Sequence, residues 1–327
     1  MAPVAVAASF WWSLPGAAGA VGFTGQEPSE LEAFEECEAA GQASDWDSAA
    51  ARCETALAAF PDNFGIHYFL GFAYQGRQEW DRAATAFEAF IAAAEAEASS
   101  DAGESTPPRF TEEVAQARRN AGIARVRAGD FDAAVPLLRQ VREGDPADAE
   151  AAFMLGVAEL ERGESAAAAT AFAAAVAEVP EMAPAQFLLG RLRYEAGVYP
   201  EARERLEQYL AAEPAGSFST EAHWIAGSIA LRALAAVEED EEPPAAPRDR
   251  AIHHFSGFLE GEPAGSRAAT AHYFLATFLE DSGACEAARD HYRRFLEIAP
   301  DHERAAEVRE YLAHESSRCG VPGPAPA

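Results

Sequence analysis

Residues 153–180 read FMLGVAELERGESAAAATAFAAAVAEVP, and residues 187–214 read FLLGRLRYEAGVYPEARERLEQYLAAEP. In both stretches a Leu-Gly pair is followed by apolar residues 12, 16 and 19 positions after the glycine and by proline 24 positions after it. The two glycines, Gly156 and Gly190, are 34 residues apart. A period of this length indicates a solenoid built from helix hairpins. The matching positions are Ala168, Phe172, Ala175 and Pro180 in the first copy and Ala202, Leu206, Tyr209 and Pro214 in the second.

Each position in this pattern has a physical reason. Gly156 is expected on the first helix of a hairpin, where a side chain would push the crossing second helix away. Ala168 is small for the same reason, and Phe172 fills the space beside the crossing. Gly163 is expected to end the first helix in the left-handed conformation, and Pro180 to stop the second. One hairpin cannot bury its apolar face alone, so stacked neighbours are required.

The pattern recurs seven times between Ser29 and Ser317 and resembles the tetratricopeptide repeat family. The resemblance implies an all-α, right-handed superhelical solenoid of about seven helix hairpins with a C-terminal cap helix. It is specific for the fold but not for the function, because proteins that share this scaffold bind different partners. The expected repeats span 29–61, 64–95, 115–146, 149–180, 183–214, 220–263 and 269–300, and the cap helix spans 301–317.

Residues 1–28 form an apolar leader in which positions 2–23 carry no charge. Its small residues around Ala17–Ala20 resemble the cleavage region of a secretory signal, although the usual basic start is missing and the first arginine is Arg52. We therefore expect a signal peptide and an exported protein of the bacterial periplasm or cell envelope. The alternatives are a cytoplasmic protein with a disordered leader, and a membrane anchor, which Pro15 disfavours.

The chain is strongly acidic, with 54 acidic and 25 basic residues, a net charge of −29 and no lysine. This balance argues against nucleic acid as a partner, because phosphate binding needs basic residues. The charge favours solubility and is compatible with a cationic partner. The acidic segment 238–249 is expected to be a solvated loop, because it lacks the pattern of a calcium loop. The tail 318–327, rich in proline, glycine and alanine, is expected to be disordered.

An aromatic residue lies three positions before the glycine position in six of the seven repeats, and Arg119 takes that place in the third. The resemblance implies that the first helices line the concave surface, so these residues would form an apolar groove suited to a peptide or helix. The alternative is ordinary packing between neighbouring repeats. The candidate groove residues are Phe34, Tyr68, Phe69, Phe72, Arg119, Phe153, Phe187, Arg191, Trp224, Tyr273 and Phe274.

One binding mode of the family is not expected here. Co-chaperone members clamp a C-terminal carboxylate with lysine, asparagine and arginine side chains on the groove. This chain has no lysine, and only Arg119, Asn120, Arg191 and Arg232 remain as isolated polar candidates. We therefore expect no clamp of this kind.

No metal site or cofactor is expected from the sequence. His67, His223 and His272 lie in different repeats, so they cannot all share one ion. His253 and His254 are adjacent on a helix and are expected to point to different faces. Each of these histidines is interpreted as packed or solvated.

The four cysteines suggest two local disulfides. Cys37 and Cys53 are expected on the two antiparallel helices of the first repeat, and Cys319 should return near Cys285 through the cap helix. Such pairs would pin the two ends of a solenoid. Four cysteines allow three connectivities, of which only this one is local. The alternative is that cysteine serves as a small buried apolar residue.

The sequence predicts a protein–protein interaction scaffold that holds a partner protein or peptide and performs no chemistry. A self-assembling structural subunit of an envelope complex is the first alternative. An enzyme acting in the groove is the second, but the sequence offers no nucleophile–base pair, phosphate loop or metal-ligand cluster.

Overall fold

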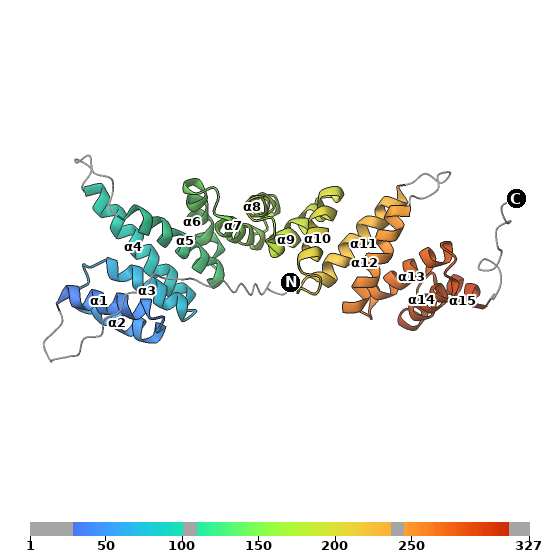
Figure 1. The fold of residues 1–327 in the computed structure, drawn as a ribbon, viewed down its shortest axis with the longest axis horizontal. Coiled ribbons are helices and arrows are strands. Elements are labelled where there is room, and N and C mark those ends of the chain that lie inside the picture. Colours follow the sequence, from blue (N-terminus) through green and yellow to red (C-terminus); the bar gives the residue numbers. More distant parts are fainter. Residues whose placement is uncertain (1–28, 101–109, 237–244, 314–327) are drawn as a thin grey trace. The chain divides into compact units, whose positions relative to one another are not determined.

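A computed structural model describes residues 29–100, 110–236 and 245–313 (Figure 1). These residues form fifteen α-helices and, within the described ranges, no strand. The helices divide into two compact units, Met1–Glu164 and Ser165–Ala327, and the division falls within the fourth predicted repeat. The all-α class predicted from the sequence is therefore confirmed.

Within the described ranges, the first unit has seven helices and the second has eight. In the first unit they are α1 (Glu30–Gln42), α2 (Trp46–Ala59), α3 (Gly65–Gly76), α4 (Trp80–Ser100), α5 (Thr111–Ala128), α6 (Phe131–Gly144) and α7 (Ala149–Glu161). In the second unit they are α8 (Ser165–Glu178), α9 (Ala183–Glu195), α10 (Tyr199–Ala212), α11 (Ser219–Ala235), α12 (Ala245–Gly261), α13 (Ser266–Asp281), α14 (Cys285–Ile298) and α15 (Ala305–Ala313).

The helix ends follow local signals in the sequence. The Ser29 side chain accepts the backbone N–H of Glu32, whose carboxylate accepts the N–H of Ser29, which makes a capping box at the start of α1. Asp45, Asp130 and Asp148 each accept a backbone N–H at the start of α2, α6 and α7. Gly163 has a φ of 82°, the left-handed conformation expected after the first helix of a repeat.

The predicted close helix crossings are present in both units. A Cβ built on Gly71 would lie 2.6 Å from the ring of Phe87, and one on Gly227 would lie 2.8 Å from Phe255. Both rings are fully buried, and so are the facing residues Ala83 and Ala251. The alternation of small and large residues therefore brings the two helices of each hairpin together, as the repeat pattern predicts.

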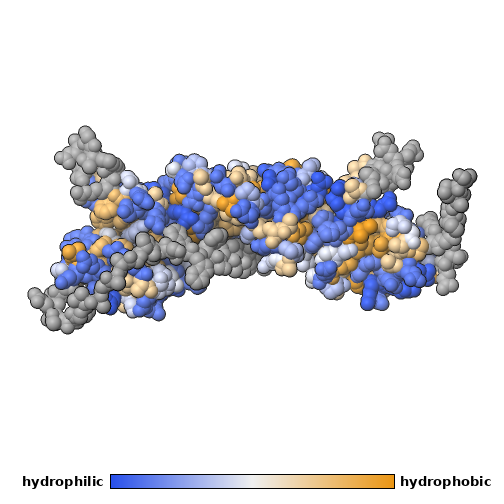
Figure 2. All heavy atoms as spheres, in the orientation of Figure 1, coloured by the Kyte–Doolittle hydropathy of each residue, from blue (hydrophilic) through white to orange (hydrophobic). Residues whose placement is uncertain are grey.

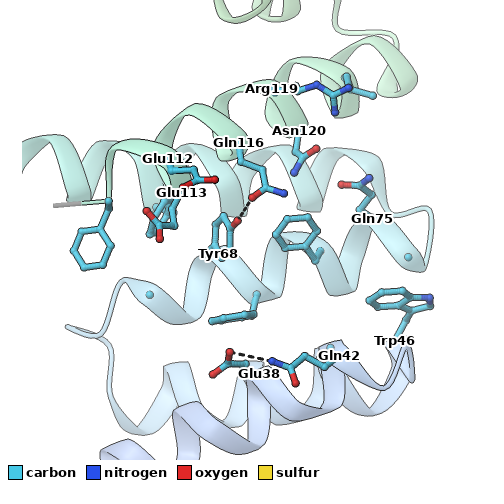
Figure 3. Close-up of a pocket in the computed structure, with 18 of the residues that line it drawn as sticks. Glu38, Gln42, Trp46, Tyr68, Gln75, Glu112, Glu113, Gln116, Arg119 and Asn120 are labelled. Carbon is cyan, nitrogen blue, oxygen red and sulfur yellow. Dashed lines mark hydrogen bonds between the residues drawn. The ribbon is translucent and has the colours of Figure 1, made fainter. Parts of the chain in front are cut away.

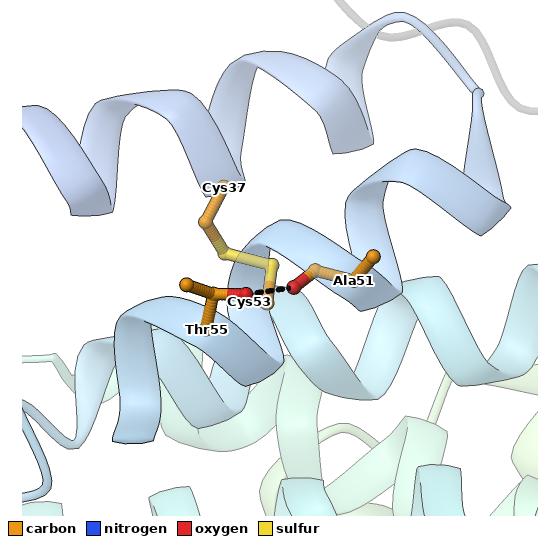
Figure 4. The surroundings of a disulfide bond; sticks show 4 residues. All are labelled: Cys37, Ala51, Cys53 and Thr55. Atoms are coloured by element: carbon orange, nitrogen blue, oxygen red, sulfur yellow. Dashed lines mark hydrogen bonds between the residues drawn. A yellow bond between two sulfur atoms is a disulfide. The ribbon is translucent and has the colours of Figure 1, made fainter. Parts of the chain in front are cut away.

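The disulfide between Cys37 and Cys53 joins α1 to α2, with the two Cα atoms 4.7 Å apart (Figure 4). Both residues are fully buried in the core of the first unit. This pairing confirms the prediction for the N-terminal end of the fold. Cys319 lies outside the described residues, so its pairing with Cys285 stays a prediction.

A final helix covers the end of the second unit, where the sequence predicts a cap. In α15, Val308 is buried, and Tyr311 packs against Tyr292 of α14 with ring centroids 4.9 Å apart. Arg289 also donates a hydrogen bond of 3.1 Å to the carbonyl oxygen of Leu312. The leader 1–28, most of the acidic segment and the tail lie outside the described residues.

The surface is mostly polar, which agrees with the 24% of charged residues in the sequence. Figure 2 shows hydrophilic residues over most of the face in view, with smaller hydrophobic areas between them. In the described ranges, Leu31, Phe110 and Val198 are the exposed large apolar residues. No helix in this part of the chain combines the length and apolarity needed to cross a membrane.

Candidate functional site

A deep pocket lies in the first unit, where the first helices of three successive repeats come together (Figure 3). Its volume is ≈ 960 Å³, which is large enough for several side chains of a bound peptide. Residues of α1, α3 and α5 form most of its lining, and Trp46 and Trp80 come from the second helices. The aromatic lining residues are Phe34, Trp46, Tyr68, Phe69, Phe72, Trp80, Phe90 and Phe110.

The aromatic residues of α3 form a connected cluster. Tyr68 packs edge-on against Phe69 and Phe72, with ring centroids 5.5 and 5.0 Å apart, and Phe69 meets Phe34 of α1 at 5.3 Å. Positions 68, 69 and 72 share one face of a helix, which explains why one element supplies three of these rings. Each ring is held by its neighbours, so the apolar surface of the pocket is formed before any ligand arrives.

The Tyr68 hydroxyl crosses from α3 to α5, where it donates a hydrogen bond of 2.6 Å to Oε1 of Gln116 (Figure 3). Burial of the ring, with the nearby charges of Glu113 and Glu112, raises the pKa of Tyr68 to about 12. The phenol therefore remains protonated at neutral pH and continues to act as a donor.

Two polar side chains at the same pocket have unused hydrogen-bonding atoms. Asn120 is 3% exposed, and its Nδ2 has no hydrogen-bond partner among the described residues. Oε1 of Gln75, also buried, lacks a partner within the same ranges. Both side chains line the pocket, from α5 and α3 (Figure 3). One atom is a donor and the other an acceptor, which are the two groups that a peptide backbone can satisfy.

Charge around the pocket is mainly negative. Glu38, Glu112, Glu113 and Glu150 contribute carboxylates to the lining. Arg119 donates hydrogen bonds to Asp148, at 2.6 Å, and to Glu150, so this cation is already paired within the protein. Arg127 lies over the ring of Trp80 at 4.9 Å. The pocket therefore presents an apolar interior with an acidic border.

The structure separates the predicted groove residues into two groups. Phe34, Tyr68, Phe69, Phe72 and Arg119 meet at the pocket of the first unit.

The other predicted residues are engaged in packing. Phe153 is buried, and Phe187 is 1% exposed and stacks on Phe218 at 4.5 Å. Trp224 packs between its neighbours, 5.1 Å from the ring of Phe258. The remaining members are Arg191, which lies over Phe187, and the partly buried Tyr273 and Phe274, which contact each other.

Some residues that line the pocket were not predicted as site residues from the sequence. Trp46 and Trp80 lie at the first position of a second helix in successive repeats, a signal that could have found them. Gly76 makes room for one of them, because a Cβ there would lie 2.2 Å from the indole of Trp46. Phe110 follows residues 101–109, and no repeat position marks it.

The histidines differ from the expectation in one respect. His253 and His254 of α12 do not point to separate environments, because the His223 ring of α11 lies near both, at 5.8 and 5.3 Å between centroids. Adjacent helical residues are about 100° apart, so a ring from a facing helix can meet both. Burial lowers the pKa of His254 to about 3, which keeps this ring neutral.

Comparison with known families identifies the class of protein. A model of the tetratricopeptide repeat matches residues 35–98, 119–183 and 248–303, and a second tetratricopeptide repeat model matches residues 159–218. These matches cover more than half of the chain, so the protein belongs to the tetratricopeptide repeat family. Proteins of this family are generally non-enzymatic scaffolds that bind protein or peptide partners, and the fold supports that general role.

Several solved structures are similar to this chain. "Crystal structure of YrrB: a TPR protein with an unusual peptide-binding site" is 19% identical, with 59% of this chain and 91% of that chain covered and a TM-score of 0.49. PilF of Pseudomonas aeruginosa is 14% identical, covering 74% and 95%, with a TM-score of 0.48. A MamA structure is 20% identical, covering 56% and 98%, with a TM-score of 0.45. Among curated proteins no match is found.

Proposed function

We propose that this protein is a non-enzymatic scaffold that binds an extended segment of a partner protein in the pocket of the first unit. The observation that carries this proposal is the unused donor of Asn120 and the unused acceptor of Gln75 beside the aromatic cluster. A buried polar atom without a partner is costly, and a ligand that satisfies it gains that free energy on binding. An extended peptide offers both a carbonyl oxygen and an N–H group.

The chemistry of the pocket specifies the segment further. The rings of Tyr68, Phe69 and Phe72 would bind an aliphatic or aromatic side chain of the partner. The carboxylates of Glu112 and Glu113 at the border would favour arginine or lysine beside it and would repel acidic segments. We therefore infer a ligand with one or two apolar anchors flanked by basic residues.

The cellular setting is a separate proposal. We infer that the protein is exported to the periplasm or cell envelope, on the basis of the apolar leader and the Cys37–Cys53 disulfide. Disulfides persist mainly in oxidising compartments. The intact mass of protein recovered from its native host, alkylated without reduction, tests this. A full-length mass with four alkyl adducts, one for each cysteine, would contradict it.

Selection from a library of random peptides tests the binding proposal. Untagged full-length protein is the bait, and an Asn120→Ala, Phe72→Ala variant is used for counter-selection. Peptides enriched only on the wild type should share apolar anchors with basic neighbours. Their affinity, measured by fluorescence anisotropy, should fall about tenfold or more in the double variant.

A matched control is Phe274→Ala, which removes a partly buried ring in the second unit. It should leave the affinity unchanged. Equal binding by wild type and the pocket variant would overturn the proposal. If the protein is instead a self-assembling subunit, its mass measured by sedimentation should rise with concentration. This concentration dependence should disappear in the pocket variant.

A further inference from the structure

Three imidazoles converge on one point in the second unit. His223 lies on α11, and His253 and His254 lie on α12. One ring nitrogen from each residue lies within 4.8 Å of the other two. The Nδ1 atoms of His223 and His254 are 3.1 Å apart. Two nitrogens bound to one tetrahedral zinc ion at about 2.0–2.1 Å would lie about 3.3 Å apart.

The surroundings hold two of these rings in place. His254 is 4% exposed, so its ring cannot turn to solvent. His223 fits against α12 only because residue 257 is glycine, since a Cβ there would lie 2.6 Å from Nε2 of His223. Among the seven repeats, glycine occupies this position only in the sixth. His253 is exposed and is free to close the remaining gap toward the pair.

The seventh repeat provides an internal comparison. His272 of α13 and His291 of α14 occupy the repeat positions of His223 and His254, and their Nδ1 atoms are 2.8 Å apart. The residue that corresponds to His253 is Asp290, which forms an ion pair with Arg293 at 2.7 Å. Three histidines therefore converge in one repeat, while its neighbour keeps only the pair.

We propose that His223, His253 and His254 form a binding site for a divalent transition-metal ion of the zinc class. Three imidazole ligands suit Zn²⁺, which would keep its fourth position for water. In the free protein one Nδ1 donates its proton to the other, and metal binding moves that proton to Nε2, so both Nδ1 atoms become ligands. The bound ion would join α11 to α12.

The charges near the site act in both directions. Glu260 of α12 exerts a favourable field on a cation at His223, and Arg250 of the same helix acts against a cation at His254. The acidic protein as a whole attracts divalent cations weakly and without selectivity. The test must therefore separate the imidazole site from this background.

Titration with Zn²⁺ and with Co²⁺ tests the proposal. The titration uses full-length protein without an affinity tag. Bound metals are first removed with a chelator, and accessible thiols are alkylated without reduction. Calorimetry should find one Zn²⁺ per chain at the site in the presence of excess Mg²⁺. Co²⁺ should give the visible absorption bands of a tetrahedral complex, and Zn²⁺ should displace them.

Variants decide which residues bind the ion. His253→Ala should weaken Zn²⁺ binding about tenfold or more and abolish the Co²⁺ bands, because the third ligand is lost. The double variant His223→Gln, His254→Gln should lose Zn²⁺ binding at the site. The double variant His272→Gln, His291→Gln, in the neighbouring repeat, is the control and should keep it. Equal Zn²⁺ binding by wild type and His253→Ala, or loss of binding in the control pair, would overturn the proposal. His253 is exposed, so its variant decides the matter even where the buried substitutions impair folding.

Discussion

The Tyr68 hydroxyl of α3 donates a 2.6 Å hydrogen bond to Gln116 Oε1 of α5 and thereby joins two of the helices that line the pocket. The bond joins the second repeat to the third, across residues 101–109 that intervene in the chain. A phenol held this way presents its ring to the pocket and keeps its polar atom satisfied.

Tyr68→Phe tests this link without removing the ring. The loss of one hydrogen bond should reduce the free energy of unfolding by about 1 kcal/mol. Chemical denaturation monitored by circular dichroism would measure the change. Because the ring remains, peptides selected on the wild type should still bind. Unchanged stability would show that the Tyr68–Gln116 bond contributes nothing in solution.

The Cys37–Cys53 disulfide closes a short loop at the N-terminal end of the fold. Replacing both residues with alanine should cost about 3 kcal/mol of unfolding free energy in the chain-entropy model. Denaturation of the double variant beside the oxidised wild type measures this. Reduction of the wild type alone is a weaker test, because it would also reduce the predicted Cys285–Cys319 disulfide.

Gly71 provides a test of the helix crossing. Gly71→Ala would place a Cβ 2.6 Å from the buried ring of Phe87. The overpacked core should lose about 1–3 kcal/mol of stability. Gly144→Ala is the matched control, because a Cβ there meets nothing within 4 Å at the end of α6. It should be neutral or stabilising by up to about 1 kcal/mol.

Much of the fold could be predicted from the sequence because repeated spacings report helix packing directly. Gly71 and Gly227 lie where the pattern places a close helix crossing. Cys37 and Cys53 occupy two repeat positions that face each other across the hairpin, and they form the disulfide there. Each of these relationships depends on residues within one hairpin. Such local geometry is fixed by helical periodicity, which a single sequence displays.

The candidate site was harder to predict, because a residue's position in the repeat does not show whether the neighbouring repeat buries its side chain. Tyr68 and Phe187 occupy the same repeat position, yet one lines a pocket and the other stacks on Phe218 inside the core. The difference arises from the neighbouring repeat, where Phe218 fills the space. The convergence of His253 with His223 depends likewise on how two helices face each other, which spacing within one helix does not reveal.

The His272–His291 pair predicts a pH dependence of the second unit. Burial, followed by the charges of His291 and Arg294, lowers the pKa of His272 to about 4, and burial lowers the pKa of His291. Glu297 and Asp290 act in the opposite direction. The unfolded chain binds protons below pH 6.5 while the folded pair does not, so stability should fall as the pH drops from 6.5 toward 4.

Thermal unfolding between pH 7 and pH 4, with a chelator present throughout, measures this effect. The midpoint should fall with pH in the wild type and fall less steeply in His272→Gln with His291→Gln. Nuclear magnetic resonance of the His272 ring should show it neutral at pH 5. A ring that titrates near pH 6.5 would contradict the prediction.

The ion pairs of Arg119 predict that the pocket does not bind the C-terminal carboxylate of a peptide. Its guanidinium is already paired with Asp148 and Glu150, so it is not available to clamp a C-terminal carboxylate. The carboxylates of Glu112 and Glu113 would also repel such a group. Peptides selected on the wild type should therefore bind at least as well with an amidated C-terminus as with a free one. A clamp would instead make amidation cost about tenfold in affinity, and fluorescence anisotropy with the two forms of one peptide distinguishes these outcomes.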